Sequence, residues 1–551
     1  MRRGPPSRSQ PDNGLLRALL AAAAFGPCAD DRATKSFSTE TGLALQTSIT
    51  RDGTALYARG DAGRVLSWPV PLPAPLVPKP TAPLMHTPPT INRRTFLEKS
   101  SLATAGLWLG GCVTAGRSIA RRIAPDEKMR IGCIGIGGQG GGVTAELAKF
   151  ADVEIAALCD VDPAYALKNS KKYPTAPFYS DYREMLAKEK KLHAVMIATP
   201  DHWHAPISLA AMSLGLHVYC EKPLAHTIEE ARLMGRVARE TGVVTQMGQT
   251  GHASEGLRLT KEWIDAGAIG AVSEVHAWSD RPGKFWRTQG QRRPTETPPV
   301  PKGLDWNLWL GAAPERAYAP GLYHPFAWRD WQDFGGGALG DFGCHILDPV
   351  FTGLGLTAPL SIMAENSGVN RHIWPTTETV RYVFPGTEFT AGDKLKVTWT
   401  DGGLRPERKL AGMSGDLDLP KSGSLFLGEK GNMVLPHVGG PRLYPAENFT
   451  GFTYPKDIKG VNHWHTWVDG IISGRRTSAG FHYAGLLAEA VQLGNVATRV
   501  ARRNLITRGT KKSDAGSELR WDTENFRITN HAEAQALLTK TYRRGFEVAA
   551  A

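Results

Sequence analysis

From Met129 onward the chain alternates short apolar runs with longer amphipathic segments. The apolar runs predict strands, and segments whose apolar residues recur every three or four positions predict helices. The predicted strands are the run that ends before Gly135 and the segments 153–159, 194–199, 217–220 and 243–246. The predicted helices cover 143–150, 182–188, 206–214 and 228–240. Strands separated by helices of this length imply parallel pairing, so residues 129–250 are predicted to form a doubly wound sheet.

Residues 251–545 show a different pattern, in which a few helices accompany a larger number of strands. The predicted helices cover 255–266, 462–473 and 483–502, and the predicted strands include 272–278, 380–384, 395–399 and 424–427. We expect these strands to belong to one large, open mixed sheet. The overall fold class is therefore α/β, with a doubly wound parallel sheet followed by an α+β domain with closing helices.

The first 128 residues lack this regularity. Residues 1–84 are rich in Pro, Ala, Ser and Arg and show no sustained helical or strand period, so we expect a disordered leader or a wrongly included segment. Met85 is a plausible alternative start. Residues 85–128 then have the order of an export signal followed by a linker: a basic region and an apolar stretch.

The basic region contains Arg93 and Arg94, with Phe96 and Leu97 two residues further on, and the apolar stretch covers 102–113. This arrangement resembles a twin-arginine translocation signal, which implies an exported, periplasmic protein and the twin-arginine export machinery as a partner. About 20 residues are needed to span a bilayer, so a stretch of about a dozen fits a removed signal better than a membrane anchor.

Leu109-Gly110-Gly111-Cys112 also resembles a lipobox, which would make Cys112 an acylated N-terminus and give the protein a lipid anchor. Ordinary cleavage near residues 115–120 is the alternative. Both remain open.

Composition excludes several other classes. An apolar fraction of 41% and a charged fraction of 21% are those of a globular protein. Residues 1–128 hold 17 Lys and Arg against 9 Asp and Glu, so eight of the twelve excess positive charges lie there. We therefore expect no nucleic-acid partner. The six cysteines form no CxxC pair, and Cys133, Cys159 and Cys220 lie within apolar runs, where a thiol is usually a core residue.

The first candidate site follows the first predicted strand. Gly135, Gly137 and Gly140 form a GxGxxG pattern, in which the glycines allow a tight turn, close approach of the backbone to a pyrophosphate and close helix packing. The second strand ends at Asp160, 20 residues after Gly140, where a carboxylate can bind the adenosine ribose. The cofactor predicted is NAD. NADP stays possible because Arg183 and the lysines near Lys171 lie nearby in sequence.

The later strands end at two polar segments, Thr199-Pro200-Asp201-His202-Trp203-His204 and Glu221-Lys222-Pro223. Ligands of open parallel sheets bind at the carboxyl ends of the strands. Glu-Lys-Pro about 80 residues after GxGxxG resembles the glucose-fructose oxidoreductase, inositol dehydrogenase and MocA (Gfo/Idh/MocA) family of oxidoreductases. The resemblance covers about residues 129–545. It implies a Rossmann fold and places an essential lysine, here Lys222, beside the nicotinamide.

A second signature lies at Gly335-Gly336-Gly337-Ala338-Leu339-Gly340-Asp341-Phe342-Gly343-Cys344-His345. On a helix, Asp341 and His345 are four residues apart and share one face. They match the family's DxxxH pattern, which implies that His345 takes the hydroxyl proton as hydride leaves, while Lys222 and Asp341 orient and tune it.

Two alternatives are open for these residues. Asp341 and His345 could be a helix-terminal acid and a structural histidine. Alternatively, His202 and His204 with Asp341 and His345 could ligate a metal. The resemblance accounts for all four positions without one, so we expect no metal.

The resemblance, together with the glycine pattern, gives the full set of expected cofactor contacts: Gly135, Gly137, Gly138, Gln139, Gly140, Asp160, Thr199, Pro200, His204, Glu221 and Lys222. A stretch rich in aromatic and basic residues suits a sugar, whose apolar C–H faces alternate with hydroxyls. The substrate contacts expected from it are Trp286, His324, Trp328 and Arg329. Alternatively, many of these aromatic residues are core.

The leading hypothesis is therefore an NAD-dependent dehydrogenase of a sugar, glycoside or polyol. It holds its cofactor tightly, because an exported enzyme cannot draw on a free cofactor pool. We also expect a homo-oligomer formed through the C-terminal sheet. The first alternative is a glycosidase that oxidises a sugar carbon, eliminates the aglycone and reduces the carbon again. The Tyr-rich active-site segment of such relatives is not found here in place of 335–345. The second is a non-catalytic sugar sensor, which would not need Lys222, Asp341 and His345 together.

Overall fold

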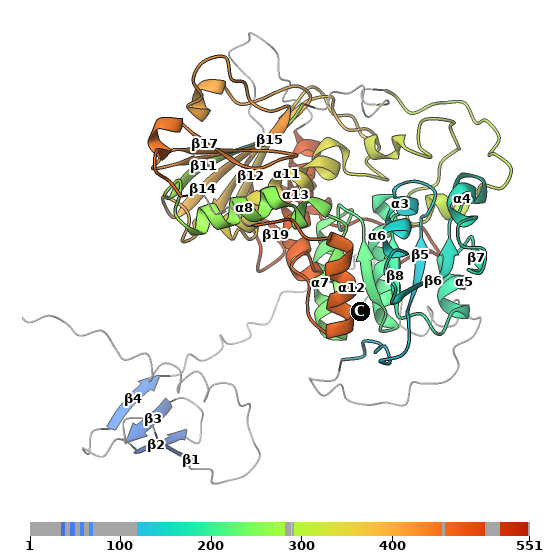
Figure 1. The fold of residues 1–551 in the computed structure, drawn as a ribbon, viewed down its shortest axis with the longest axis horizontal. Helices are drawn as coiled ribbons and strands as arrows, with labels where there is room; N and C mark the ends of the chain where they lie inside the picture. Colours follow the sequence, from blue (N-terminus) through green and yellow to red (C-terminus); the bar gives the residue numbers. More distant parts are fainter. Residues whose placement is uncertain are drawn as a thin grey trace, which may run out of the picture. The chain divides into compact units, whose positions relative to one another are not determined.

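The structure is a computed structural model that describes residues 118–280, 288, 291–453, 458–501 and 518–548, together with four strands between residues 35 and 69. The chain divides into two compact units, residues 1–90 and 91–551. Figure 1 shows both units coloured along the sequence. The proposed signal, including Arg93, Arg94 and Cys112, lies outside the described residues.

The first unit contains a four-stranded antiparallel sheet in the order β1-β2-β3-β4. The strands are β1 (Lys35–Ser38), β2 (Ala44–Ile49), β3 (Ala55–Arg59) and β4 (Val65–Pro69). The sequence analysis predicted a disordered or wrongly included leader for residues 1–84, and these four strands lie within it. The strands are only four to six residues long. Alternation that short does not stand out as a sustained period.

The second unit begins with a six-stranded parallel sheet in the order β10-β9-β8-β5-β6-β7. Its strands are β5 (Met129–Ile134), β6 (Val153–Cys159), β7 (Phe178–Tyr179), β8 (Ala194–Ile197), β9 (His217–Cys220) and β10 (Thr245–Met247). This order, with β5 central and the chain running outward in both directions, is the doubly wound arrangement that the sequence predicts. Cys133, Cys159 and Cys220 are buried in these strands, as predicted.

Helices cover both faces of this sheet. They are α3 (Gln139–Leu147), α4 (Pro163–Ser170), α5 (Tyr182–Lys188), α6 (His204–Ser213) and α7 (Ile228–Thr241). One face also packs against α12 (His463–Ser473), whose Trp467 and Val468 share a buried cluster with Ile131 and Val143. A helix from near the end of the chain therefore packs on the first domain.

The ends of α7 illustrate how sequence sets an element. The Thr227 hydroxyl accepts the Glu230 N–H, and the Glu230 carboxylate accepts the Thr227 N–H, which together form a capping box. At the other end, Gly242 has a φ of 71°, a left-handed conformation that glycine adopts without strain.

The second domain contains a nine-stranded sheet in the order β17-β16-β15-β11-β14-β13-β12-β18-β19. Its strands are β11 (Val272–Ser279), β12 (Ser361–Asn366), β13 (Glu378–Pro385), β14 (Lys394–Thr400), β15 (Ser422–Gly428), β16 (Asn432–Pro436), β17 (Arg442–Tyr444), β18 (Leu519–Asp522) and β19 (Arg527–Ile528). The pair β11 and β14 is parallel, and the other neighbouring pairs are antiparallel. The large mixed sheet, and with it the predicted fold class, is confirmed.

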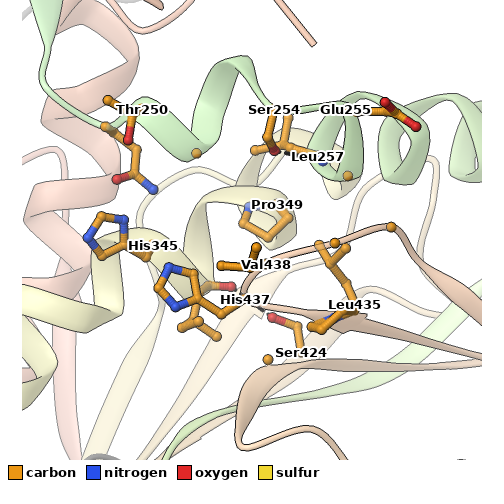
Figure 2. A pocket seen from close by; sticks show the side chains of 18 residues that line it. Thr250, Ser254, Glu255, Leu257, His345, Pro349, Ser424, Leu435, His437 and Val438 are labelled. Atoms are coloured by element: carbon orange, nitrogen blue, oxygen red, sulfur yellow. Dashed lines mark hydrogen bonds between the residues drawn. The ribbon is translucent and has the colours of Figure 1, made fainter. Parts of the chain in front are cut away.

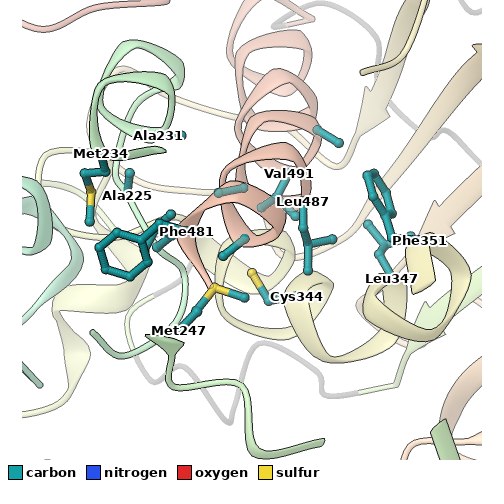
Figure 3. Packing of buried hydrophobic residues seen from close by; sticks show 14 of the residues in the cluster. Ala225, Ala231, Met234, Met247, Cys344, Leu347, Phe351, Phe481, Leu487 and Val491 are labelled. Atoms are coloured by element: carbon teal, nitrogen blue, oxygen red, sulfur yellow. The ribbon is translucent and has the colours of Figure 1, made fainter. Parts of the chain in front are cut away.

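The helices of the second domain are α8 (Glu255–Asp265), α10 (Trp306–Leu310), α11 (Cys344–Leu354), α13 (Phe481–Val500) and α14 (Ala532–Ala536). Of these, α13 packs both against α7 of the first domain and against β12 and β13 of the large sheet. Figure 3 shows Phe481 beside Met234 and Met247 at one end of this contact, and Leu487 and Val491 further along α13. One continuous core thus connects the two domains, which fixes the glycine-rich turn relative to α11.

Within the described part of the chain, no helix combines the length and apolar character that crossing a membrane requires.

Candidate active site

The glycine-rich turn leaves β5 at Gly135, whose φ of 80° is left-handed. A Cβ on Gly140 would lie 2.1 Å from the Gly135 carbonyl oxygen, and a Cβ on Gly135 would lie 2.8 Å from the Ala198 backbone. Real atoms do not approach this closely, so both positions require glycine. The turn therefore runs directly against β5 and β8 into the N-terminus of α3. A helix N-terminus favours an anion such as a phosphate.

Gly137 and Gly138 form the outer part of the turn and, with Gln139, line a cavity of about 530 Å³. A Cβ on Gly137 would lie 2.1 Å from the Tyr165 ring, so this glycine lets the ring lie flat against the turn. A bare backbone at this point can approach a pyrophosphate closely.

Asp160 follows β6 and lies beside the turn. Its carboxylate accepts the Gly137 N–H at 2.9 Å and the Asp162 N–H at 3.0 Å. Burial raises the pKa of this carboxyl to about 6, although the backbone hydrogen bonds oppose the shift. Each carboxylate oxygen can accept a second hydrogen bond, so Asp160 retains acceptor capacity toward the cavity, which it lines.

Lys222, Asp341 and Arg329 meet at the other end of the same cavity. The Lys222 Nζ lies 2.6 Å from the Asp341 Oδ1, and the Arg329 Nε lies 3.4 Å from the same oxygen. Burial by itself would raise the pKa of Asp341, but the two cations hold it well below its usual range. Asp341 is thus a buried carboxylate that stays ionised and holds the Lys222 ammonium group in place.

Two buried polar atoms near Lys222 have no hydrogen-bond partner: the Glu221 Oε1 and the Thr199 Oγ1. Both residues line the cavity. Burial raises the pKa of Glu221 to about 7, while Lys222 opposes the shift. A buried polar group without a partner costs about 1–3 kcal/mol, so these atoms fit a ligand with polar groups of its own, such as the carboxamide of a nicotinamide.

The structure places His204 differently from our expectation. Its ring is buried, with Nδ1 2.7 Å from the Pro223 carbonyl and Nε2 2.9 Å from the Thr199 carbonyl. His204 is not among the described residues that line the cavity, whereas Thr199 and Pro200 are. It joins the two loops that carry Thr199 and Lys222, and so acts on the site through the backbone.

His345 lies on the first turn of α11, and Asp341 lies on a π-helical turn, Leu339–Gly343, directly before it. Both line the cavity, and His345 is close enough to contribute to the lowered pKa of Asp341. The two residues therefore converge on one space as predicted from their spacing, although a π-helical turn connects them.

Sequence reasoning missed His437. It follows β16, and its ring centroid lies 5.2 Å from that of His345 and 5.4 Å from that of Phe342. His437 also lines the cavity. Only the strand pattern before it could have suggested a loop near the site, because it belongs to no local motif.

The predicted substrate contacts divide into three groups. Trp328 and Arg329 line the cavity, and the Arg329 guanidinium lies 4.3 Å from the centre of the Trp328 ring, beside Asp341. His324 also lines it, but its Nε2 is 2.9 Å from the Asp162 carboxylate and its ring contacts Tyr165. That position is next to the glycine-rich turn rather than next to Lys222. Trp286 lies outside the described residues.

The two histidines considered as metal ligands are held apart from the reacting groups. The His202 Nε2 lies 3.1 Å from the Trp309 carbonyl, and His204 contacts two backbone carbonyls. Across the described residues, no group of three or more His, Cys, Asp or Glu side chains has the arrangement of a metal site.

Comparison with known proteins identifies both domains. Residues 129–249 match the family model of the oxidoreductase family with an NAD-binding Rossmann fold. Residues 257–385 match the model of the C-terminal α/β domain of the same oxidoreductase family. Both models are those of the Gfo/Idh/MocA oxidoreductase family. NAD is thus the cofactor of the matched fold, in agreement with the predicted cofactor.

Curated relatives of the chain include a levoglucosan dehydrogenase from Pseudarthrobacter phenanthrenivorans, 29% identical over 192 residues. That match covers 35% of this chain and 40% of the dehydrogenase. An α-N-acetylgalactosaminidase from Shewanella oneidensis is 33% identical over 162 residues, which cover 25% of this chain and 35% of the relative. The chain thus spans less than half the length of either.

Among solved structures, the WlbA dehydrogenase from Bordetella pertussis in complex with NADH and UDP-GlcNAcA aligns with a TM-score of 0.47 and 19% identity. The alignment covers 68% of this chain and 97% of that one.

Proposed function

We propose that the protein is an NAD-dependent oxidoreductase that transfers a hydride from a carbon bearing a hydroxyl group, in a sugar, glycoside or polyol. The observation that carries this proposal is one continuous cavity, lined at one end by the glycine-rich turn with Asp160 and at the other by Lys222, Asp341 and His345. A volume of about 530 Å³ is within the usual range for a cofactor or substrate site.

The chemistry divides between the cofactor and the chain. Bound NAD would supply the hydride acceptor. Oxidation of the hydroxyl also releases its proton, and His345 is the group in the cavity suited to take it. Lys222, held by Asp341, would donate a hydrogen bond to the same oxygen and stabilise the negative charge that develops there.

Preference for NAD over NADP is supported by the charges around Asp160. An ionised carboxylate would repel a 2′-phosphate. Arg183, one of the cations that left NADP open, makes three hydrogen bonds to the Asp181 carboxylate. Among the described residues that line the cavity, the lysine is Lys222 and the arginine is Arg329. Both lie at the Asp341 end of the cavity, away from Asp160.

A redox-neutral glycosidase is the second candidate. It is favoured by the relatives described as glycosyl hydrolase family 109 proteins, for example one from Solibacter usitatus that is 35% identical over 150 residues. Such an enzyme would use the same three groups but release an aglycone without net reduction of NAD.

One experiment separates these possibilities. The purified protein is denatured and any released dinucleotide is identified. The native protein is then mixed with a panel of sugars and glycosides, while absorbance at 340 nm and free aglycone are recorded. A dehydrogenase gives absorbance without aglycone, and a glycosidase gives aglycone without lasting absorbance. Absence of both, with dinucleotide released on denaturation, indicates a sensor and contradicts the proposal.

We further propose that the protein is exported by the twin-arginine pathway to the periplasm with NAD already bound, either as a cleaved protein or anchored through Cys112. Folded proteins use this pathway, which suits an enzyme that must retain its cofactor. A homo-oligomer through the C-terminal sheet also stays a prediction, which sedimentation of the purified protein can test.

A further inference from the structure

A second cavity of about 510 Å³ adjoins the reacting end of the first. His345, His437 and Thr250 line both cavities, so the histidine pair forms part of a shared wall. Figure 2 shows the two imidazole rings side by side, with Thr250 near His345 and with Leu435 and Val438 on the far side of His437. The second cavity therefore begins where the proposed hydride transfer would occur and extends away from the cofactor.

Gln249 supplies a polar atom that this cavity leaves without a partner. Its side chain is 1% exposed, and its Nε2 donates to the Cys344 carbonyl at 3.1 Å. The Oε1 of the same amide is buried and accepts no hydrogen bond. Because an unsatisfied buried acceptor is costly, this atom indicates a ligand that carries a hydroxyl or N–H donor.

The walls of the cavity are held by backbone contacts. The His437 N–H donates to the Ser422 carbonyl at 2.9 Å, which fixes the start of the loop after β16. A Cβ on Gly256 would lie 2.1 Å from the Gly439 carbonyl oxygen, so the loop rests directly on the first turn of α8. Ser424 is already engaged, because its hydroxyl donates to the Ile346 carbonyl.

The remaining lining is uncharged apart from one residue. Leu257, Pro349 and Leu435 give the cavity apolar surfaces. Among the described residues that line it, Glu255 is the one acidic residue, and no Lys or Arg is present. A carboxylate and an unpaired amide oxygen disfavour an anionic ligand and favour one that donates hydrogen bonds. A neutral carbohydrate has both features, because its apolar C–H faces alternate with hydroxyl groups that donate hydrogen bonds.

We propose that this cavity, the second-sugar pocket, binds the second sugar of a glycoside whose first sugar is oxidised beside Lys222 and His345. This inference rests on the proposed function and narrows its substrate class from any sugar or polyol to a disaccharide or larger glycoside. A single sugar in contact with Lys222 cannot also fill a second cavity of about 510 Å³. The pocket therefore adds binding energy for glycosides alone.

Val438→Trp tests the pocket without touching the first cavity. Val438 is 84% exposed, lines the second-sugar pocket and is absent from the lining of the first cavity. A tryptophan there would fill the space while the fold is maintained. Ile472→Trp is the matched control, because Ile472 is also exposed, at 55%, and lies on α12 in neither lining. Gln249→Met is a second test variant that removes the unpartnered acceptor.

Reduction of bound NAD is followed at 340 nm in single-turnover experiments with glucose and galactose, their methyl glycosides, and disaccharides that contain them. Here kcat is the maximal rate of that reduction, and KM is the sugar concentration that gives half of it. For the wild type and Ile472→Trp, we expect kcat/KM to be at least about tenfold higher for a disaccharide than for its free sugar or methyl glycoside. Val438→Trp should remove this advantage while changing kcat/KM for the smaller sugars less than about twofold. Gln249→Met should raise KM for the disaccharide more than it lowers kcat.

The inference is overturned if Val438→Trp leaves the disaccharide advantage intact, or if it affects small and large substrates equally. It is also overturned if the wild type prefers a free sugar. In these cases the wild type still reduces NAD, so the proposed function stands. A wild type that neither oxidises nor cleaves any sugar of the panel contradicts the proposed function, and it also contradicts the assignment of the second-sugar pocket.

Discussion

Lys222 and Asp341 are 119 residues apart in the sequence, yet the Nζ of one lies 2.6 Å from the Oδ1 of the other. Lys222 follows β9 of the first domain, and Asp341 precedes α11 of the second. The pair therefore spans the boundary between the dinucleotide-binding domain and the domain with the large sheet. Since α13 packs on both domains, their relative position is fixed by a common core rather than by this ion pair alone.

Lys222→Ala should lower kcat by roughly 10²–10⁴-fold, the usual contribution of one proton-transfer or charge-stabilising group. Dinucleotide should remain bound, because the glycine-rich turn and Asp160 are unchanged. Stopped-flow reduction of bound NAD gives the rate, and release on denaturation gives the occupancy. Arg329 still lies 3.4 Å from Asp341, so the carboxylate keeps one cation and the fold should survive. Turnover at the wild-type rate would contradict the assignment of Lys222.

Asp160→Ala should raise the Kd for NAD by about 10–100-fold, the loss expected when hydrogen bonds from ribose hydroxyls to a charged acceptor are removed. Binding of NADP should weaken less or improve, because the variant no longer repels the 2′-phosphate. Fluorescence titration with both nucleotides measures the ratio. Glu154→Ala is the control, since Glu154 lies on β6, the strand that Asp160 follows, and pairs with Arg130 outside the cavity. An unchanged ratio of the two Kd values would place the ribose contact elsewhere.

Gly137→Ala should weaken NAD binding by at least about tenfold, because the new methyl group would lie 2.1 Å from the Tyr165 ring and on the path of the pyrophosphate. Gly142→Ala is a matched control. Gly142 lies on α3 and a Cβ there would have no atom within 4 Å. That change should leave NAD affinity intact and stabilise the helix by about 0.5–1 kcal/mol. Equal NAD affinity in the two variants would argue against close approach at Gly137.

The first domain was largely predictable because each element carries its own signal. Val153–Cys159 and His217–Cys220 are strands with the predicted bounds, since each is a short apolar run that ends at a polar residue. The helix after the glycine-rich turn begins at Gln139 rather than at Val143. Its first turn consists of Gln139 and three glycines, which carry no apolar period, so tertiary contacts with Gly135 and Ala198 determine that start.

The site was predictable only where it rests on motifs. Lys222, Asp341 and His345 lie in compact signatures, and the structure brings all three to one cavity. His437 and Tyr165 reach the same cavity through loop and helix packing, which no local spacing encodes. His204 lies within a predicted segment, but its ring turns toward two backbone carbonyls. A motif thus indicated which segments meet, whereas side-chain direction depended on packing.

Replacing Arg93 and Arg94 together with lysine should trap the precursor in the cytoplasm, because the translocation signal that the sequence resembles depends on the arginine pair. Fractionation of cells that express the tagged protein measures this. Replacement of Arg121 and Arg122, a second pair that lies after the apolar stretch, is the control and should leave export unchanged. Normal export of the Arg93 and Arg94 variant would refute the signal.

Glu221→Gln should change how stability depends on pH. Burial raises the pKa of Glu221 from 4.5 to about 7 in the folded protein. The folded state therefore holds a proton that the unfolded state releases, so this group favours folding below about pH 4.5 and loses that contribution as pH rises through about 7. A shift of this size corresponds to about 3 kcal/mol.

The apoprotein is the right form for this measurement, because a ligand that donates to Glu221 would favour the ionised carboxylate and reduce the effect. Urea unfolding at intervals from pH 5 to pH 8.5 gives the free energy of unfolding for both proteins. Asp160 and Asp201 also have raised pKa values, so the wild type alone does not isolate one group. The difference in the free energy of unfolding between the wild type and Glu221→Gln isolates Glu221, because glutamine keeps the size of the side chain and cannot titrate. The wild type should lose about 3 kcal/mol relative to the variant over this range, and parallel curves would mean that Glu221 is already ionised in the folded protein at pH 5.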